Sequence, residues 1–150
     1  MNFEDVILLD APRQQVWDLL LDVNRFAACM PGVEQVTQVD DRTFDGVIQA
    51  SVGPMTGKFS FRAHIVESEP PRELNANVEG TDSVTNSTLT ADMAMTLDAP
   101  SAEQTRLTYQ AKVDIHGRLA ILGDMVLRAT ASLLLADFGK RLRQQLESVK

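Results

Sequence analysis

The chain has 150 residues, of which 44% are hydrophobic, and a formal net charge of −7 at pH 7. This length suits one domain with its own core, and the acidic balance argues against a nucleic-acid partner, because phosphate neutralisation needs clustered Lys and Arg. A single cysteine, Cys29, excludes an internal disulfide framework and a cysteine-based zinc site.

Neither a membrane span nor a secretion signal is evident in the sequence. No apolar run approaches the roughly 20 residues that a spanning helix needs. The first ten residues are acidic and lack the basic region and small-residue cleavage site of a signal peptide. We therefore expect a cytoplasmic protein in which residues 1–150 form one domain.

The N-terminal part reads as a strand followed by two short helices. Residues 2–10 predict a strand, and Pro12 suits the first turn of a helix. A second short helix is predicted at residues 26–28, and it must end before Pro31, because Met30 precedes a proline and is pushed away from helical angles. The apolar stripe of the first helix is Val16, Trp17, Leu20 and Leu21.

From Val33 to Ile115 the apolar residues alternate with polar ones, which is typical of half-buried strands. Turn residues divide this stretch into six strands joined by short connections, so the strands should form an antiparallel meander. The predicted turns lie at residues 40–42 and 53–57, at Pro70–Pro71, near 81–82 or 86–87, and at 99–103.

The last third predicts one long amphipathic helix from Arg118 to nearly the end of the chain. Its basic residues gather late, which fits a helix C-terminus that complements its own dipole. Those basic residues are Lys140, Arg141, Arg143 and Lys150, and the apolar positions are Leu119, Leu122, Val126, Leu133, Leu134, Phe138, Leu142 and Leu146. The fold class is therefore α+β, with a curved antiparallel sheet of about seven strands wrapped around this helix.

Small residues on the apolar strand faces favour an apolar chamber between the sheet and the helix. They include Gly46, Ala63, Ala76, Ala91 and Ala111. Methionines, which adapt to varied apolar guests, point the same way, although tight packing remains the alternative. The predicted lining is Phe59, Phe61, Met93, Met95, Ile115, Leu122 and Leu133, with Phe26 and Met30 near the mouth.

Catalytic chemistry is not indicated by the sequence. Strand parity places His64 and His116 on the face opposite the apolar one, where solvated side chains are expected. No nucleophile elbow, phosphate loop, dinucleotide fingerprint or zinc helix is present, and no cofactor or metal is expected. Cys29 has no evident basic neighbour and reads as a small buried apolar residue.

The element order resembles the helix-grip fold of the START and Bet v 1 (SRPBCC) superfamily, and several motifs resemble the family of the G subunit of carbon monoxide dehydrogenase. The resemblance implies a non-catalytic accessory protein of molybdenum hydroxylases, with an apolar cavity for a quinone or another lipid-like molecule. Those motifs are Val16–Trp17, Pro31–Glu34, Val52–Phe59, the Pro71 break, Thr105–Tyr109 and Gly117–Gly123.

Two features depart from the family's pattern. Some members carry a long tail with a membrane anchor, and this sequence stops at Lys150. Family members also often have a glycine-rich hairpin where this chain has Thr81–Thr88. We therefore expect membrane contact to be at most transient. Two alternatives stay open: a docking or maturation module with a filled core, and a superfamily enzyme of the cyclase or hydratase type.

Overall fold

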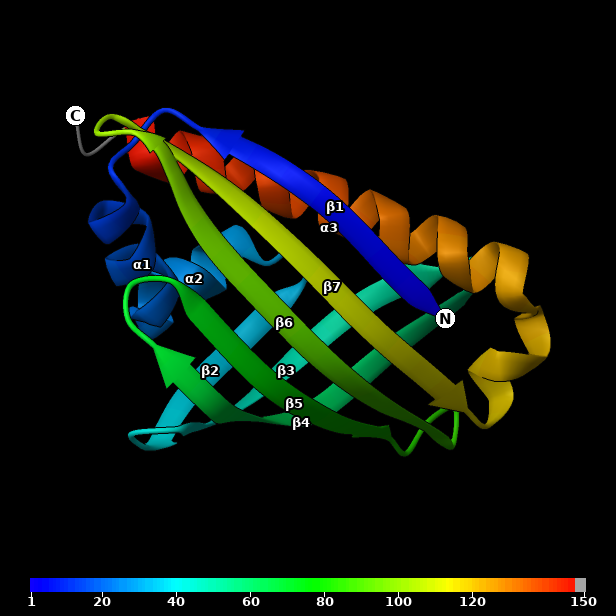
Figure 1. Cartoon of the computed structure of the whole chain (residues 1–150). Coiled ribbons are helices and arrows are strands. Elements are labelled where there is room, and N and C mark those ends of the chain that lie inside the picture. The colour runs from blue at the N-terminus through cyan, green and yellow to red at the C-terminus, as the bar shows by residue number, and fades with distance from the viewer. Residues whose placement is uncertain (148–150) are drawn as a thin grey trace.

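A computed structural model describes residues 1–147 and shows seven strands, two short helices, a 3-10 turn and one long helix (Figure 1). Lys150, one of the late basic residues, lies outside the described part. The strands are β1 (Asn2–Leu9), β2 (Val33–Asp40), β3 (Thr43–Val52), β4 (Met55–Glu69), β5 (Glu73–Asp82), β6 (Ser87–Ser101) and β7 (Gln104–His116). The helices are α1 (Arg13–Leu21), α2 (Val23–Cys29) and α3 (Asp124–Glu147), with the 3-10 turn η1 at Arg118–Leu122.

All seven strands belong to one antiparallel sheet in the order β1-β7-β6-β5-β4-β3-β2. Each strand from β2 to β7 pairs with its neighbour in sequence, and β1 returns to pair with β7. The sheet curves, and α3 runs lengthwise beside β1 (Figure 1). The predicted α+β helix-grip architecture is confirmed.

Local chemistry sets the two short helices. Pro12 accepts hydrogen bonds from the backbone N–H groups of Gln15 and Val16 at the start of α1. The carboxylate of Asp22 then accepts from the N–H groups of Asn24 and Arg25, at 3.1 and 3.2 Å, and so caps α2. This cap begins α2 at Val23, before the predicted residue 26.

The long helix begins later than predicted. The sequence predicted one helix from Arg118, but the structure has the short turn η1 and then α3 from Asp124. Gly117 and Gly123 flank η1 with φ of +97° and +89°, values that side chains rarely adopt. Gly123 therefore separates the two segments.

The helix α3 is fixed along the free edge of β1. The Arg128 guanidinium donates to the Asn2 carbonyl, and the Arg143 Nε donates to the Leu8 carbonyl, both at 3.4 Å. Between them, a Cβ at Gly139 would lie 3.4 Å from Ile7 Cδ1, so helix and strand approach closely there. These contacts cover an edge that would otherwise present unpaired backbone groups.

The core is divided into two clusters at opposite ends of the sheet. The first and larger cluster joins β1, α1 and α2 to the C-terminal half of α3, and includes Val16, Trp17, Leu107, Phe138 and Leu142. The second joins the end of β3 and the start of β4 to η1 and the start of α3. Its buried members are Val52, Phe59, Leu119 and Leu127.

Candidate functional site

Two rows of mainly small side chains cross the inner face of the sheet between these clusters, and we call them the central rows. Cross-strand pairing aligns Ala63, Val78, Ala91 and Val113 in one row. The next row contains Ile65, Ala76, Met93, Ala111 and Phe3. Strand register therefore gathers the small residues noted in the sequence at one place.

The central rows are incompletely covered. Ala63, Ala76, Val78, Ala91, Met93 and Val113 are all half-buried, although they share the inner face with fully buried neighbours. On α3, Ala131, Leu134 and Leu135 are half-buried as well. The central rows are thus less well covered than the two core clusters that flank them.

Larger side chains border the central rows toward the second cluster. The Phe61 ring lies over Gly46, where a Cβ would come within 2.5 Å of Phe61 Cζ. Phe61 therefore needs a glycine opposite it on β3. Beyond it, Phe59 is buried, and Ile115 and Leu122 pack partly buried against the same cluster.

The other predicted lining residues fall near the first cluster, with one exception. Met95 is buried in the first cluster, and Met93 packs partly buried against that cluster. The strand register therefore agrees with the prediction that both methionines lie on the inner face. Phe26 and Met30 on α2 also pack partly buried against this cluster, and the Phe26 ring meets the Phe138 ring edge-on at 5.8 Å.

The exception is Leu133, and its placement on the inner face was wrong. Its side chain is 73% exposed. The buried positions of α3 are Leu127, Phe138, Leu142 and Leu146, together with Gly139. Residues seven apart lie on the same face of a helix, so Leu134 faces inward as Leu127 does, while Leu133 faces solvent.

Several inner-face residues were not predicted as lining. Val78 and Val113 share a row with Ala91, Tyr109 lies beside Met95, and Leu134 replaces Leu133. Strand parity alone could have identified Val78, Val113 and Tyr109 as inner-face residues. The choice between two adjacent leucines required the observed phase of α3.

A buried polar network closes the β5–β6 hairpin at the end near the second cluster. The Asp82 carboxylate accepts from the Lys58 N–H at 3.0 Å, the Val84 N–H at 2.9 Å and the Thr85 hydroxyl at 3.0 Å. Burial alone would raise the pKa of Asp82, but these hydrogen bonds outweigh it and hold the pKa below its usual value. The Thr85 and Ser87 hydroxyl oxygens lie 2.9 Å apart, and the Ser87 Oγ accepts from the Leu119 N–H at 3.1 Å, so the network ties the hairpin to η1.

Few titratable groups of the described strands share the inner face. Asp82 is held by the network just described, Asp5 is exposed, and Tyr109 is buried. Burial, and then the nearby Asp5 charge, raise the pKa of Tyr109. Its phenol therefore stays protonated at neutral pH and can donate a hydrogen bond to a guest.

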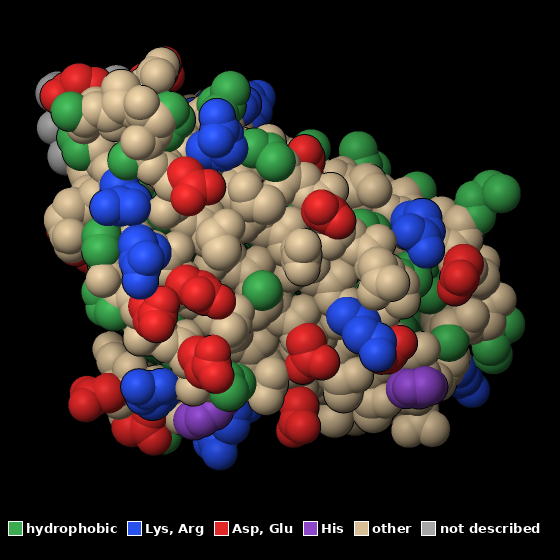
Figure 2. All heavy atoms as spheres, in the orientation of Figure 1, with side chains coloured by type: hydrophobic (Ala, Val, Ile, Leu, Met, Phe, Trp, Pro, Cys, Tyr) green, Lys and Arg blue, Asp and Glu red, His purple; other side chains and the backbone are tan. Residues whose placement is uncertain are grey.

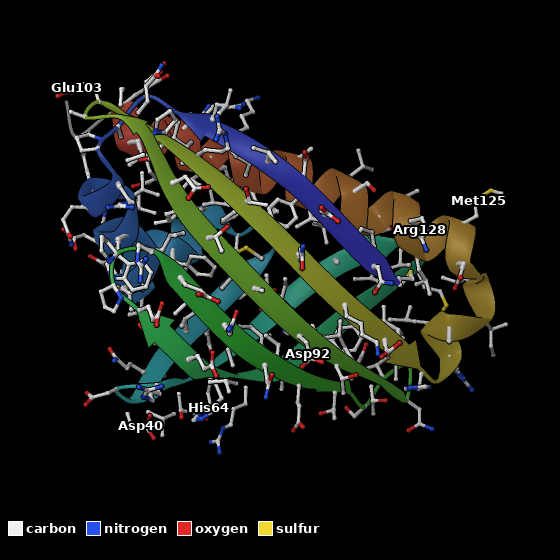
Figure 3. The ribbon with its side chains drawn as sticks, viewed as in Figure 1. Asp40, His64, Asp92, Glu103, Met125 and Arg128 are labelled. Carbon is white, nitrogen blue, oxygen red and sulfur yellow. The ribbon has the colours of Figure 1, made fainter. Side chains whose placement is uncertain are left out.

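The remaining candidate chemistry lies away from the central rows. His64 is exposed, with Nδ1 3.1 Å from the Thr43 hydroxyl, and Figure 3 shows it on the outer side with Asp92. Cys29 is fully buried. Burial raises the pKa of its thiol and outweighs the positive charges of Arg25 and Arg141, which lower it. Within residues 1–147, no group of three or more His, Cys, Asp or Glu side chains is arranged to hold a metal ion.

Two open grooves belong to the outer face of the sheet. One, of about 570 Å³, lies among Arg62, Glu79 and Thr90, and the other, of about 680 Å³, lies among Asn77, Asp92 and Lys112. These side chains have outer-face parity, and Figure 2 shows charged groups scattered over this face. The second groove is also lined by Phe3, Ala76, Met93 and Ala111 of the central rows, so part of the exposure of these residues lies on the outer face.

Comparison with solved structures places the architecture among START-like proteins. A conserved protein from Geobacillus kaustophilus has a TM-score of 0.91 at 22% identity, with 99% of this chain and 96% of that chain covered. A START superfamily protein from Mycobacterium smegmatis has a TM-score of 0.75 at 10% identity, with 99% of each chain covered. The Zhui aromatase/cyclase from Streptomyces sp. R1128 has a TM-score of 0.75 at 14% identity, with 98% of this chain and 93% of that chain covered.

These likenesses show the fold alone, because all three identities are low. No curated protein sequence matches the chain significantly. Among residues 1–147, no helix is both long and apolar enough to cross a bilayer. The family model of CoxG, the G subunit of carbon monoxide dehydrogenase, matches residues 7–147. Since this match takes in nearly the whole domain, the chain belongs to the CoxG family.

Proposed function

We propose that this protein is a non-catalytic carrier that holds a small apolar molecule, quinone- or lipid-like, above the central rows. In this proposal it works in the cytoplasm and serves a molybdenum hydroxylase, in assembly, membrane recruitment or electron transfer. The observation that carries the proposal is the half-buried inner face between two separate core clusters. Family membership supports the accessory role, and the START-like fold supports an apolar guest.

The composition of the space supports an apolar guest of variable shape. Its floor is Ala63, Ala76, Ala91 and Met93, and Phe61 and Leu134 stand at its sides. Methionine and small aliphatic side chains impose little shape of their own. Tyr109 offers a hydroxyl near this floor, which suits a guest that carries an oxygen acceptor on an apolar body.

The energetics of apolar burial favour a carrier that releases its cargo. A guest that buries about 300 Å² of apolar surface gains roughly 7 kcal/mol at 25 cal/mol per Å². Association costs upwards of about 4 kcal/mol, so the remainder gives weak binding. A longer apolar tail or a hydrogen bond from Tyr109 would tighten it.

An enzyme of the cyclase type is the second candidate, because the Zhui aromatase/cyclase shares the fold. That function would need acid and base groups directed at a substrate. The titratable groups of inner-face parity on the described strands are Asp5, Asp82 and Tyr109, of which Asp82 already accepts three hydrogen bonds. This arrangement favours the carrier over the enzyme.

The proposal is tested by direct observation of a guest. Native mass spectrometry of gently purified protein should show a retained small molecule or, after extraction, an empty protein that reloads with decylubiquinone. Decylubiquinone should also displace an apolar fluorescent probe from one saturable site. Leu133→Ser, on the outer face, should leave this displacement unchanged. Absence of any saturable site in extracted protein would favour the docking module with a filled core.

A further inference from the structure

The groove of about 680 Å³ on the outer face of the sheet is built by strand register around one small residue. Cross-strand pairing places Ala94 of β6 between Asn75 of β5 and Gln110 of β7. Both neighbours carry longer side chains on this face, so the methyl group of Ala94 leaves a hollow between them. We call this feature the outer hollow. The charged residues on its border are Glu4, Glu67, Asp92 and Lys112.

The charge at the outer hollow is negative and largely unpaired. Three carboxylates and one ammonium group border it. Within residues 1–147, the carboxylates of Glu4 and Asp92 make no hydrogen bond or ion pair, and the Lys112 ammonium takes part in no ion pair. By contrast, Asp45 on the same face of the sheet pairs with Arg62 at 2.7 Å. The outer hollow therefore presents carboxylates that are available to a cation from outside the chain.

The amide of Asn75 adds an acceptor without a donor to the same border. Its Nδ2 donates to Glu67 at 3.3 Å, whereas its Oδ1 is shielded from water and accepts no hydrogen bond within the described chain. A shielded carbonyl oxygen without a donor is unfavourable, so rotation of this amide toward an incoming N–H group would be favoured. Figure 3 shows Asp92 on the side of the sheet turned away from α3, where such a group would arrive. Carboxylates and an amide oxygen together suit a positively charged group with several donors.

Exposed apolar side chains beside the outer hollow favour a protein partner over a small free cation. Val66 lines the hollow and is 46% exposed. On β1, Val6 and Leu8 are 48% and 61% exposed and share outer-face parity with Glu4. A small cation at an open surface gains little from carboxylates alone, because water and salt screen the charges. A protein segment also covers the apolar groups with its side-chain stems.

We propose that the outer hollow is a docking site for a protein partner, which inserts an arginine side chain from an exposed basic segment. A guanidinium carries five N–H donors in one plane and pairs with carboxylates and amide oxygens at once, which suits this border. The net charge of −7 attracts such a segment to the protein, and the outer hollow fixes where it docks. The outer hollow opens on the opposite face of the sheet from α3, so the inference does not depend on the carrier function.

The test uses the full chain and a short peptide, acetyl-Gly-Arg-Leu-Arg-Gly-amide, in proton–nitrogen NMR titrations at low and at physiological salt. The side-chain amide resonances at the border of the outer hollow should shift together and saturate, more tightly at low salt. The amides of Asn24 and Asn86, which lie elsewhere, should stay fixed. A peptide with glutamine in place of both arginines should cause no saturable shift. The reporting amides are Asn2, Asn75, Asn77 and Gln110.

Two changes at the outer hollow should each weaken binding of the arginine peptide. Ala94→Leu fills the hollow without a change of charge and should abolish the saturable shifts, whereas Gln49→Leu, on the outer face of β3, should bind as wild type does. The triple variant Glu4→Gln/Glu67→Gln/Asp92→Asn should lower the affinity about fivefold. Its matched control removes the same charge at exposed positions elsewhere and should lower the affinity less than about twofold. That control is Asp41→Asn/Glu103→Gln/Glu147→Gln.

Several outcomes would overturn the docking proposal. Equal weakening by the two triple variants would show diffuse attraction to an acidic surface, and wild-type affinity of Ala94→Leu, or no saturable shift in wild type, would show that the hollow binds nothing. If spermidine causes the same shifts with equal affinity, the outer hollow takes small cations and the assignment to a protein partner is wrong. Displacement of the apolar probe by decylubiquinone should be the same in Ala94→Leu and wild type, so failure there bears on the carrier function alone.

Discussion

A large side chain placed on the central rows would show whether the region between the sheet and α3 is hollow or packed. Ala91 lies between Val78 and Val113 on the neighbouring strands, and its side chain is half-buried on the inner face. Replacement by tryptophan would direct an indole from this position toward α3. In a packed core the ring has no room, and in a hollow it occupies the place of the guest.

The expected cost differs clearly between these two cases. An indole that enters open apolar space buries about 150 Å² and gains up to roughly 4 kcal/mol, which offsets the strain of fitting it. We therefore expect Ala91→Trp to unfold within about 1 kcal/mol of wild type. Overpacking a filled core typically costs about 1–3 kcal/mol for a few methylenes, and a full indole should cost more than about 3 kcal/mol.

The assay combines stability with binding. Urea unfolding gives the free-energy difference, and displacement of an apolar probe by decylubiquinone reports the site. The chain has a single tryptophan, Trp17, so in a Trp17→Phe background the new indole is the only strong emitter. Ala91→Trp should abolish probe binding, and its emission should resemble that of an indole shielded from water.

Ala11→Trp supplies the control for a filled site. Ala11 is 1% exposed inside the first cluster, so the same substitution there should cost more than about 3 kcal/mol. If Ala91→Trp costs as much as Ala11→Trp and leaves probe binding unchanged, the space above the central rows is filled. The carrier function would then give way to the docking module.

Three further outcomes are expected from stability measurements. Asp82→Ala should cost about 3 kcal/mol of unfolding free energy, since three hydrogen bonds to a charged acceptor are lost. Because the pKa of Asp82 is lowered in the folded protein, its stabilising contribution is present above about pH 4 and is lost as the pH falls through the folded pKa. Asp82→Asn should therefore flatten the acid limb of a curve of stability against pH. Phe138→Ala should cost about 3–5 kcal/mol and Leu133→Ala less than about 0.5, as one is buried and the other exposed. By thermal unfolding, Gly117→Ala should destabilise more than Gly123→Ala; both have positive φ, but a side chain at Gly117 also meets the Asn86 backbone, whereas the space around Gly123 is open.

The strands were predictable because their chemistry is local. Alternation from Val33 to Ile115 indicated six strands, and short turns between them implied antiparallel pairing. Small differences arose where local signals compete, as in the β5–β6 turn, which spans residues 83–86 rather than either predicted pair. The strand parity also placed Met93 and Met95 on the correct face.

The start of the long helix was not predictable from periodicity. Leu119, Leu122 and Val126 follow a spacing that fits both a continuous helix and a 3-10 turn followed by a helix, since both geometries bring residues three apart together. The difference rests on the positive φ of Gly123, a backbone property that composition does not show. The assignment of Leu133 rather than Leu134 to the inner face depended on this same helical phase.

The division of the core bears on the proposed carrier function, because the two clusters hold α3 independently of the central rows. The first cluster fixes α1, α2 and the C-terminal half of α3, and the second fixes η1 and the start of α3. Because α3 is held at both ends and along β1 by Arg128 and Arg143, its middle need not pack against the sheet. Small residues on the central rows therefore cost little stability, and a guest can enter or leave without loosening either cluster. The two clusters carry the fold, and under the proposed carrier function the rows between them are the part that a guest covers.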